Sequence, residues 1–212
     1  MNKKFLKALA LVGCALLLVT ASVVGTYAVL TSQTATITNT FTAGQVAITL
    51  DEATVDVYGV VDTGAGRKVA DPEQTVGNSY KLIPTHTYVK DPTVHVVEGS
   101  EPCWLFVKVV NGISDIEIAE DATNEAGETE TIAEQMAANG WVALTGYENV
   151  YYYETVVDAR NAQVDKVVFG NFTLANVDVA ASATDTITIA AYAVQADGLD
   201  TPALAWTAAS FS

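Results

Sequence analysis

The sequence predicts an all-β protein, an antiparallel β-sandwich or jelly roll with a short helix and an acidic loop on its rim. Roughly seven to nine short segments rich in Val, Ile, Thr and aromatic residues follow one another, without the strand–helix alternation of a parallel sheet. Gly, Asn, Asp and Pro separate these segments, as expected for strands joined by short turns. This spacing is typical of sandwiches and jelly rolls.

Each predicted strand is a short run of β-branched, aliphatic or aromatic residues bounded by turn residues. The first two are separated by Ala43-Gly44, and in the second Val46, Ile48 and Leu50 alternate with less apolar residues, which is the period of a half-buried strand. In chain order, the predicted strands cover residues 34–39, 45–50, 53–61, 93–97, 103–110, 141–145, 150–157, 166–172 and 186–195.

Two stretches have the composition of exposed loops. Residues 62–78 contain Gly, Pro and charged residues, and residues 115–139 are acidic. The last part of the acidic loop, residues 131–139, has good helix formers followed by Gly140, which predicts a short helix with a glycine C-cap. Because no repeat and no Pro- or Ser-rich linker is evident, we expect one jelly-roll domain over residues 41–212.

The composition fits a well-buried domain with an acidic surface. Of the 212 residues, 50% are hydrophobic and 17% are charged, so disorder of the whole chain is not expected. The formal net charge of −15 becomes −18 when the three lysines Lys3, Lys4 and Lys7 at the N-terminus are removed. Such a surface repels nucleic acid and anionic lipid, so we expect no nucleic-acid partner.

The first 28 residues have the pattern of an export signal. Lysines precede an uncharged stretch, residues 8–30, that is dominated by Ala, Leu and Val. The small-x-small pattern of a signal peptidase site follows in Thr26, Tyr27 and Ala28. We therefore place cleavage after Ala28, so that Val29 is the first mature residue and the protein is secreted to the cell surface or the extracellular matrix.

Two alternatives to this cleavage stay open. The apolar run of about 23 residues is long enough to span a bilayer as an uncleaved anchor, although Thr20 and Ser22 make its second half more polar. The segment Leu11-Val12-Gly13-Cys14 looks like a lipoprotein processing box, but cleavage there would leave a long apolar segment on the mature chain. N-terminal sequencing of the secreted protein separates the three possibilities.

The sequence contains few residues suited to catalysis or metal binding. Its two histidines, His86 and His95, lie outside any H-E-x-x-H motif, which would place two imidazoles and a base around zinc. We expect two partly exposed strand or loop histidines, and leave open a zinc site built from both with a distant carboxylate. No EF-hand spacing or phosphate-binding glycine loop occurs, so we expect no catalytic residue, no metal and no cofactor.

Cys103 is the only cysteine after the signal, and it shares a strand face with Leu105, Val107 and Val109. This pattern predicts a small buried apolar residue. An intermolecular disulfide is the alternative, because an odd cysteine in a secreted protein permits one. No G-x-S-x-G motif and no nearby histidine supports a nucleophile.

Aromatic residues are concentrated in two predicted strands. Tyr151, Tyr152 and Tyr153 alternate across both faces of one, and Trp104 and Phe106 share a face of another. We expect them to pack in the core or on the sheet surface. A carbohydrate-binding platform is the alternative.

Residues 29–40 have the composition of a strand that is free to pair with another molecule. They contain no charge, no proline and no glycine, and half of them are Thr or Ser. An open sheet edge on a neighbouring copy would accept such a strand, and a subunit that donates one strand and receives one forms a head-to-tail filament. Alternatively, residues 34–39 form the first strand of their own domain. The candidate donor strand comprises Val29, Leu30, Thr31, Ser32, Gln33, Thr34, Ala35, Thr36, Ile37, Thr38 and Asn39.

Several segments together resemble the TasA/camelysin family of secreted Gram-positive proteins. They are Gly25-Thr26-Tyr27-Ala28 at the end of the signal, Asn39-Thr40-Phe41-Thr42-Ala43-Gly44, Lys81-Leu82-Ile83-Pro84, Lys90-Asp91-Pro92-Thr93-Val94 before the strand at 103–110, and Ala190-Ala191-Tyr192-Ala193-Val194-Gln195-Ala196. The resemblance implies a jelly-roll domain, export with processing by a SipW-type signal peptidase, and fibres of the biofilm matrix. It also implies that the mature N-terminal strand, here residues 29–39, completes the sheet of the next subunit.

We therefore expect a non-catalytic structural protein that forms extracellular matrix fibres. Its main partner would be further copies of the same chain, and a surface protein would anchor the fibre or nucleate its growth. Camelysin relatives are described as cell-surface metalloproteases, but this sequence has no zinc motif to carry that activity. A metalloprotease and a monomeric adhesin that binds glycans through exposed tyrosines are the alternatives.

Overall fold

The structure is a computed structural model that describes residues 3, 7, 44–71, 76–119, 131–177 and 186–211. By its internal contacts the chain divides into two units, Met1–Thr42 and Ala43–Ser212, and the fold below is that of the second. The predicted cleavage site at Thr26, Tyr27 and Ala28 and the candidate donor strand, residues 29–39, lie outside the described residues. Within the described part of the chain, we find no helix with the length and apolar character needed to span a bilayer.

The described elements are mostly short strands. In chain order they are β1 (Ile48–Ala53), β2 (Arg67–Val69), β3 (Thr87–Val89), β4 (Thr93–Val96), β5 (Ser100–Asn111), α2 (Ile132–Ala138), β6 (Trp141–Ala143), β7 (Val150–Tyr153), β8 (Val157–Ala159), β9 (Val164–Val167), β10 (Asn171–Thr173), β11 (Ile187–Gln195) and α3 (Pro202–Ala209). All pairings between these strands are antiparallel, which confirms the predicted all-β class.

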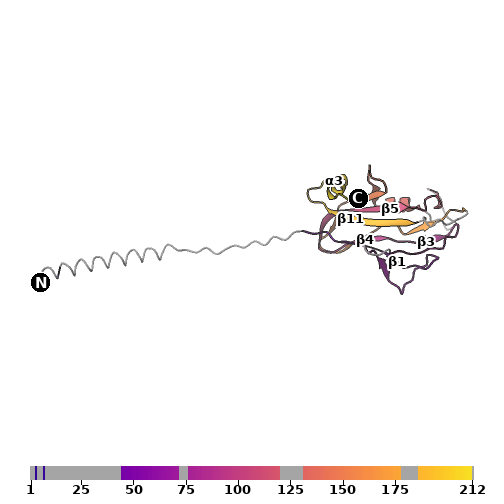
Figure 1. Ribbon diagram of the computed structural model, residues 1–212, viewed down its shortest axis with the longest axis horizontal. Coiled ribbons are helices and arrows are strands. Elements are labelled where there is room, and N and C mark those ends of the chain that lie inside the picture. Colours follow the sequence, from indigo (N-terminus) through magenta and orange to yellow (C-terminus); the bar gives the residue numbers. More distant parts are fainter. Residues whose placement is uncertain are drawn as a thin grey trace. The chain divides into compact units, whose positions relative to one another are not determined.

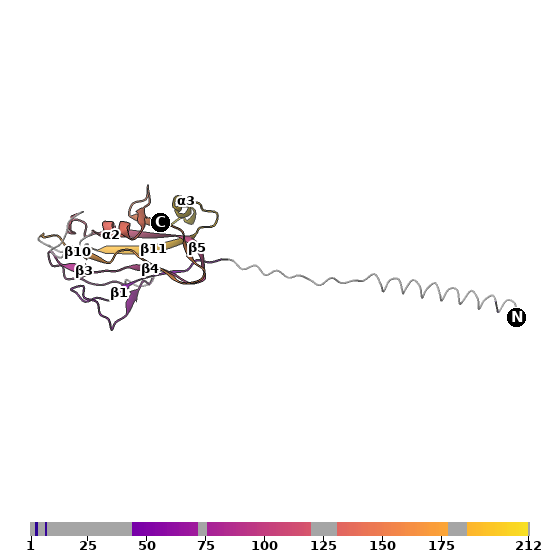
Figure 2. The same cartoon turned by 180° about the vertical axis from the view of Figure 1, so that it is seen from behind.

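The strands in the described part of the chain form three sheets. One has the order β2-β1-β4-β9, a second consists of β10 and β3, and the largest has the order β11-β5-β7-β6, with β8 pairing the first part of β5. Figure 1 and Figure 2 show β5 and β11 together in one layer, and β1, β3 and β4 in another. The 12-residue strand β5 is the centre of the large sheet because it pairs on both sides.

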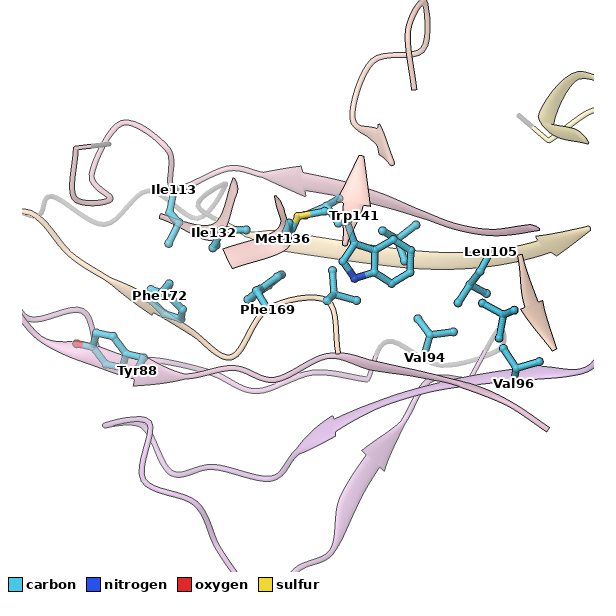
Figure 3. Close-up of a cluster of buried hydrophobic side chains, with 14 of the residues drawn as sticks. Tyr88, Val94, Val96, Leu105, Ile113, Ile132, Met136, Trp141, Phe169 and Phe172 are labelled. Carbon is cyan, nitrogen blue, oxygen red and sulfur yellow. The ribbon is translucent and has the colours of Figure 1, made fainter. Parts of the chain in front are cut away.

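The main core lies between these layers. Figure 3 shows Val94 and Val96 of β4 below Leu105 of β5 and Trp141 of β6. On β5, the residues at every second position from 103 to 109 are buried in this core, as the strand alternation predicted. Burying each large apolar side chain contributes about 1.5–3 kcal/mol relative to its exposure.

The helix α2 confirms the predicted helix and adds to the core. Thr131 is its N-cap, and its hydroxyl and the Glu134 carboxylate form a capping box. Gly140, just after the C-cap, has a φ of 86°, which a residue with a side chain rarely adopts. Because Ile132 and Met136 are buried in the main core, α2 closes part of that core and does not lie only on the rim.

A second apolar cluster lies on the opposite face of the large sheet, where the helix α3 packs. Phe106 of β5 contacts Trp206 of α3, with ring centroids 5.2 Å apart. Thr201 caps α3 and Pro202 occupies its first turn. The sequence did not predict α3, because its residues Pro-Ala-Leu-Ala-Trp-Thr-Ala-Ala show no helical alternation of apolar and polar side chains.

Several predicted strands have other bounds in the structure. The prediction for 53–61 is wrong, because the Asp56 carboxylate accepts hydrogen bonds from the backbone N–H groups of Tyr58 and Val60, both at 2.9 Å, and so stabilises a turn. An isolated bridge between Val55 and Val61 closes this turn.

The other differences concern short strands. Residues 150–157 divide into β7 and β8, and residues 166–172 divide between β9 and β10. The strand β2 lies inside the predicted loop 62–78, and β3 was not predicted. Three-residue strands are too short to show a period of two, so sequence alternation does not reveal them.

Candidate functional site

A large cavity lies between β1 and β11. Its volume is about 860 Å³. One wall is formed by residues of β1, and the facing wall by the first residues of β11. The segment 76–82, Lys68 of β2 and Ala70 form further parts of the lining. The remaining lining residues are Lys90, Pro92, Ile113 and Phe172. We call this cavity the β1–β11 groove.

The strand β11 is an edge strand within the described part of the chain. It pairs with β5 along its whole length and with no other described strand. The N–H of Gly112 donates to the carbonyl of Thr186, and the N–H of Ala196 donates to the carbonyl of Pro102, both at 2.8 Å. Even-numbered positions of β11 therefore direct their backbone groups to β5, and odd-numbered positions direct theirs away from it.

The side chains at the same odd-numbered positions point to the main core but are only half-buried. These residues are Ile187, Ile189, Ala191 and Ala193. On the adjacent strand β5, by contrast, the core-facing residues from 103 to 107 are fully buried. The difference follows from the edge position: β5 has neighbours on both sides, whereas β11 has one among the described strands.

The apolar surface continues from β11 onto the facing wall. Ile48 and Leu50 of β1, together with Tyr80 and Leu82, are also half-buried and pack against the main core. The groove thus lies beside a row of β11 backbone groups that pair with no described strand, and it contains incompletely covered apolar side chains. An extended segment that pairs with β11 would satisfy both.

The charges in the groove nearly balance. Its lining contains the lysines Lys68, Lys81 and Lys90 and the acids Asp51 and Glu52. Lys90 and Glu52 are paired with each other, with Nζ 2.5 Å from Oε2. An uncharged strand could therefore enter without leaving a buried charge unpaired.

Beside the groove, a network of charged side chains connects β1, β2 and the turn before β4. The Arg67 guanidinium donates from Nε to Asp51 and from Nη1 to Asp91, both at 2.7 Å. The Asp91 carboxylate also accepts a hydrogen bond from the backbone N–H of Ala53 at 2.7 Å. These contacts position the end of β1, which forms one wall of the groove.

His95 extends this network to β9. Its Nδ1 lies 2.7 Å from Asp165, and its Nε2 lies 3.0 Å from Asp51 without the geometry of a hydrogen bond. Burial lowers the pKa of His95, but the hydrogen bond to Asp165 and the negative charges of Asp165 and Asp51 outweigh this effect and raise the pKa above its ordinary value. When its ring is protonated, His95 joins strands β1, β4 and β9 through these two carboxylates.

The two histidines do not form the zinc site that the sequence left open. His86 hydrogen-bonds through Nε2 to the carbonyl of Tyr58 at 2.9 Å, and its ring lies 4.5 Å from that of Tyr88. His95 has different partners, and no group of three potential metal ligands occurs among the described residues. Both histidines are half-buried, as expected of strand or loop histidines.

Cys103 is fully buried, which confirms the prediction of a small apolar core residue. Burial raises the pKa of its thiol to about 11, so the thiol stays protonated near neutral pH. A buried, protonated thiol is a poor nucleophile, and this position does not favour the intermolecular disulfide.

The aromatic residues are used for packing. Tyr151 and Tyr153 pack against the main core, and Tyr152 and Trp104 pack against the α3 cluster. The indole N–H of Trp104 donates to the carbonyl of Leu199 at 2.7 Å. Because the three tyrosines are half-buried on opposite faces, they do not form one flat platform for a carbohydrate.

No local pattern in the sequence indicates the groove. Alternation did predict the strand at 186–195, and its small core-facing residues Ala191 and Ala193 are compatible with an incompletely filled edge. The edge position itself depends on strand order, which alternation does not encode. Comparison of the chain with protein-family models, with curated proteins and with solved structures found no significant match.

Proposed function

We propose that this protein is a secreted structural protein that polymerises into extracellular matrix fibres. Residues 29–39 of one copy would pair with β11 of the next copy, in the β1–β11 groove. The observation that carries the proposal is the edge of β11, which pairs with no strand other than β5 in the described part of the chain and lies beside a half-covered part of the core.

The length and chemistry of the donor segment suit this edge. The strand β11 has nine residues, and the candidate donor strand has eleven. The donor has no proline to interrupt a ladder and no charge to bury. Alternate side chains of an added strand would point into the core beside Ile187 and Ile189, where apolar or small residues such as Ala35 and Ile37 can fill the gap.

The pairing is directional, so it extends into a fibre. Each subunit has one donor segment and one groove, which are different surfaces. A contact between two different surfaces is heterologous, and it repeats without limit when the rotation between subunits does not close a ring. We further propose that the domain is a jelly roll, that a SipW-type signal peptidase releases the donor segment, and that a surface protein anchors the fibre. The resemblance to TasA/camelysin proteins supports this part of the proposal.

Deletion of residues 29–39, with the signal and its cleavage site retained, tests the proposal. Electron microscopy of the secreted protein should show filaments for the full chain and none for the deletion variant. Circular dichroism of the variant should still report a folded β protein, because the described core is built from residues within 46–211. Filaments that survive the deletion would refute strand donation.

A further inference from the structure

A buried lysine, glutamate and asparagine meet at the wall of the groove. Lys90 is 7% exposed and Glu52 is 8% exposed. The Lys90 ammonium donates to Glu52 Oε2 at 2.5 Å, and the Asn78 amide nitrogen Nδ2 donates to Glu52 Oε1 at 2.9 Å. One carboxylate therefore holds an amine and a carboxamide side by side.

Three separate parts of the fold bring these groups together. Glu52 belongs to β1, Asn78 lies in the segment 76–82, and Lys90 directly follows β3. The backbone N–H of Lys90 donates to the carbonyl of Gly170 at 3.1 Å, which fixes the chain at this lysine. The arrangement is therefore built by the fold and does not arise from neighbours in sequence.

The orientation of the Asn78 amide is set by backbone groups. The N–H of Val55, which can only donate, points to Asn78 Oδ1 at 3.2 Å. The carbonyl of Ala53, which can only accept, receives a hydrogen bond from Asn78 Nδ2 at 2.8 Å. The carbonyl oxygen thus has a fixed N–H donor, and the nitrogen faces Glu52.

Aromatic side chains lie near this group, and two of them, Tyr80 and Phe172, line the groove together with it. The ring of Tyr80 makes edge contacts with Phe172 at 5.2 Å and with Tyr88 at 5.6 Å. The Tyr80 hydroxyl donates to the carbonyl of Val89, next to Lys90. Because Lys90 and Glu52 are themselves buried, few water molecules can come between the Lys90 amine and the neighbouring carboxamide.

We propose that Lys90 and Asn78 form an intramolecular isopeptide bond, with Glu52 as the general acid and base. Glu52 takes a proton from the Lys90 ammonium, and the neutral amine attacks Asn78 Cγ to form a C–N bond. The Val55 N–H stabilises the negative charge that develops on Oδ1.

Breakdown of this intermediate completes the reaction. Glu52 returns the proton to Nδ2, the Cγ–Nδ2 bond breaks, and ammonia leaves and takes up the remaining proton as ammonium. An ammonium group and a carboxamide thereby become a secondary amide and ammonium, and nothing is oxidised or reduced. The new bond closes the chain between residues 78 and 90 into a ring that braces one wall of the groove.

Mass spectrometry of the purified mature protein tests this bond directly. We expect an intact mass lower than that of the sequence by one ammonia molecule. Tandem spectra should show a branched peptide in which residues 78 and 90 are joined. The full sequence mass, measured on folded protein after prolonged incubation, overturns the proposal. Loss of ammonia without a branched peptide, as in a succinimide at Asn78, overturns it too.

Variants separate the roles of the three residues. Glu52→Gln keeps the shape and can still hydrogen-bond but cannot take the proton, so its mass should equal the full sequence mass while circular dichroism shows a folded protein. Lys90→Arg should also have the full mass. Lys68→Arg is the matched control, because Lys68 lies opposite Glu52 in the β1–β2 pair and hydrogen-bonds to the carbonyl of Gly77. It should retain the ammonia loss, and a full mass in this variant would contradict the assignment to Lys90.

Discussion

Proline substitutions at two adjacent alanines of β11 distinguish the edge of the strand from its paired side. Ala190 and Ala191 are both half-buried, but only Ala190 directs its N–H to β5, opposite Lys108. Proline at either position removes the N–H. In Ala190→Pro a hydrogen bond within the subunit is lost, whereas in Ala191→Pro the lost N–H is the one available to an incoming strand.

The expected magnitudes follow from this difference. Ala190→Pro leaves the Lys108 carbonyl without its partner and should lower the free energy of unfolding by about 1–3 kcal/mol. Ala191→Pro should lower it by about 1 kcal/mol or less, because an edge strand tolerates proline on its unpaired side. In a fibre, Ala191→Pro leaves an acceptor on the donated strand unpaired, which costs about 1–3 kcal/mol and raises the critical concentration about 5- to 150-fold.

Two assays measure these effects separately. Urea unfolding of each proline variant, made in a chain that lacks residues 29–39, reports the stability of the subunit alone. Sedimentation of full-length mature protein over a range of concentrations reports the critical concentration for filaments. Ala191→Pro should be the stable variant that assembles poorly. If it assembles at the concentration of the unsubstituted protein, β11 does not receive a strand.

Three further predictions concern the described fold. Because folding raises the pKa of His95, its contribution to stability should be complete below about pH 6.5 and lost as the pH rises through the pKa in the folded protein. His95→Gln should therefore lower the free energy of unfolding in urea at pH 5.5 and have little effect at pH 9. Trp206→Ala should lower the free energy of unfolding by about 3–5 kcal/mol, because the indole packs against Phe106, Tyr192 and Phe211. Denaturant titration measures this loss, and a loss below about 1 kcal/mol would contradict the packing of α3. Cys103 should react with a thiol reagent at neutral pH only after unfolding, because its thiol is buried and protonated; rapid labelling of the native protein would contradict this.

The parts of the fold that the sequence predicted are those encoded by local patterns. Alternation along β5 predicted that Cys103 faces the core, and helix formers before Gly140 predicted α2. The turn at 54–61 has the same apolar composition as a strand, and only the capping contacts of Asp56 distinguish it. The composition of this segment therefore suits a strand, but its backbone forms a turn.

The candidate site could not be predicted in the same way, because it depends on contacts between distant segments. Nothing local to residues 187–195 reveals that β11 lies at the edge of its sheet. The meeting of Glu52, Asn78 and Lys90 likewise requires the positions of β1, the segment 76–82 and the end of β3. From the sequence, these three residues were indistinguishable from solvated polar residues in or beside loops.

Amide hydrogen exchange along β11 tests strand addition most directly. In the variant that lacks residues 29–39, the outward amides of Ile187, Ile189, Ala191 and Ala193 should exchange rapidly, while the even-numbered amides bonded to β5 are protected. In filaments of the mature protein, both sets should be protected. Outward amides that are already protected in the variant, or that still exchange rapidly in filaments, would contradict the addition of a neighbour's strand to β11.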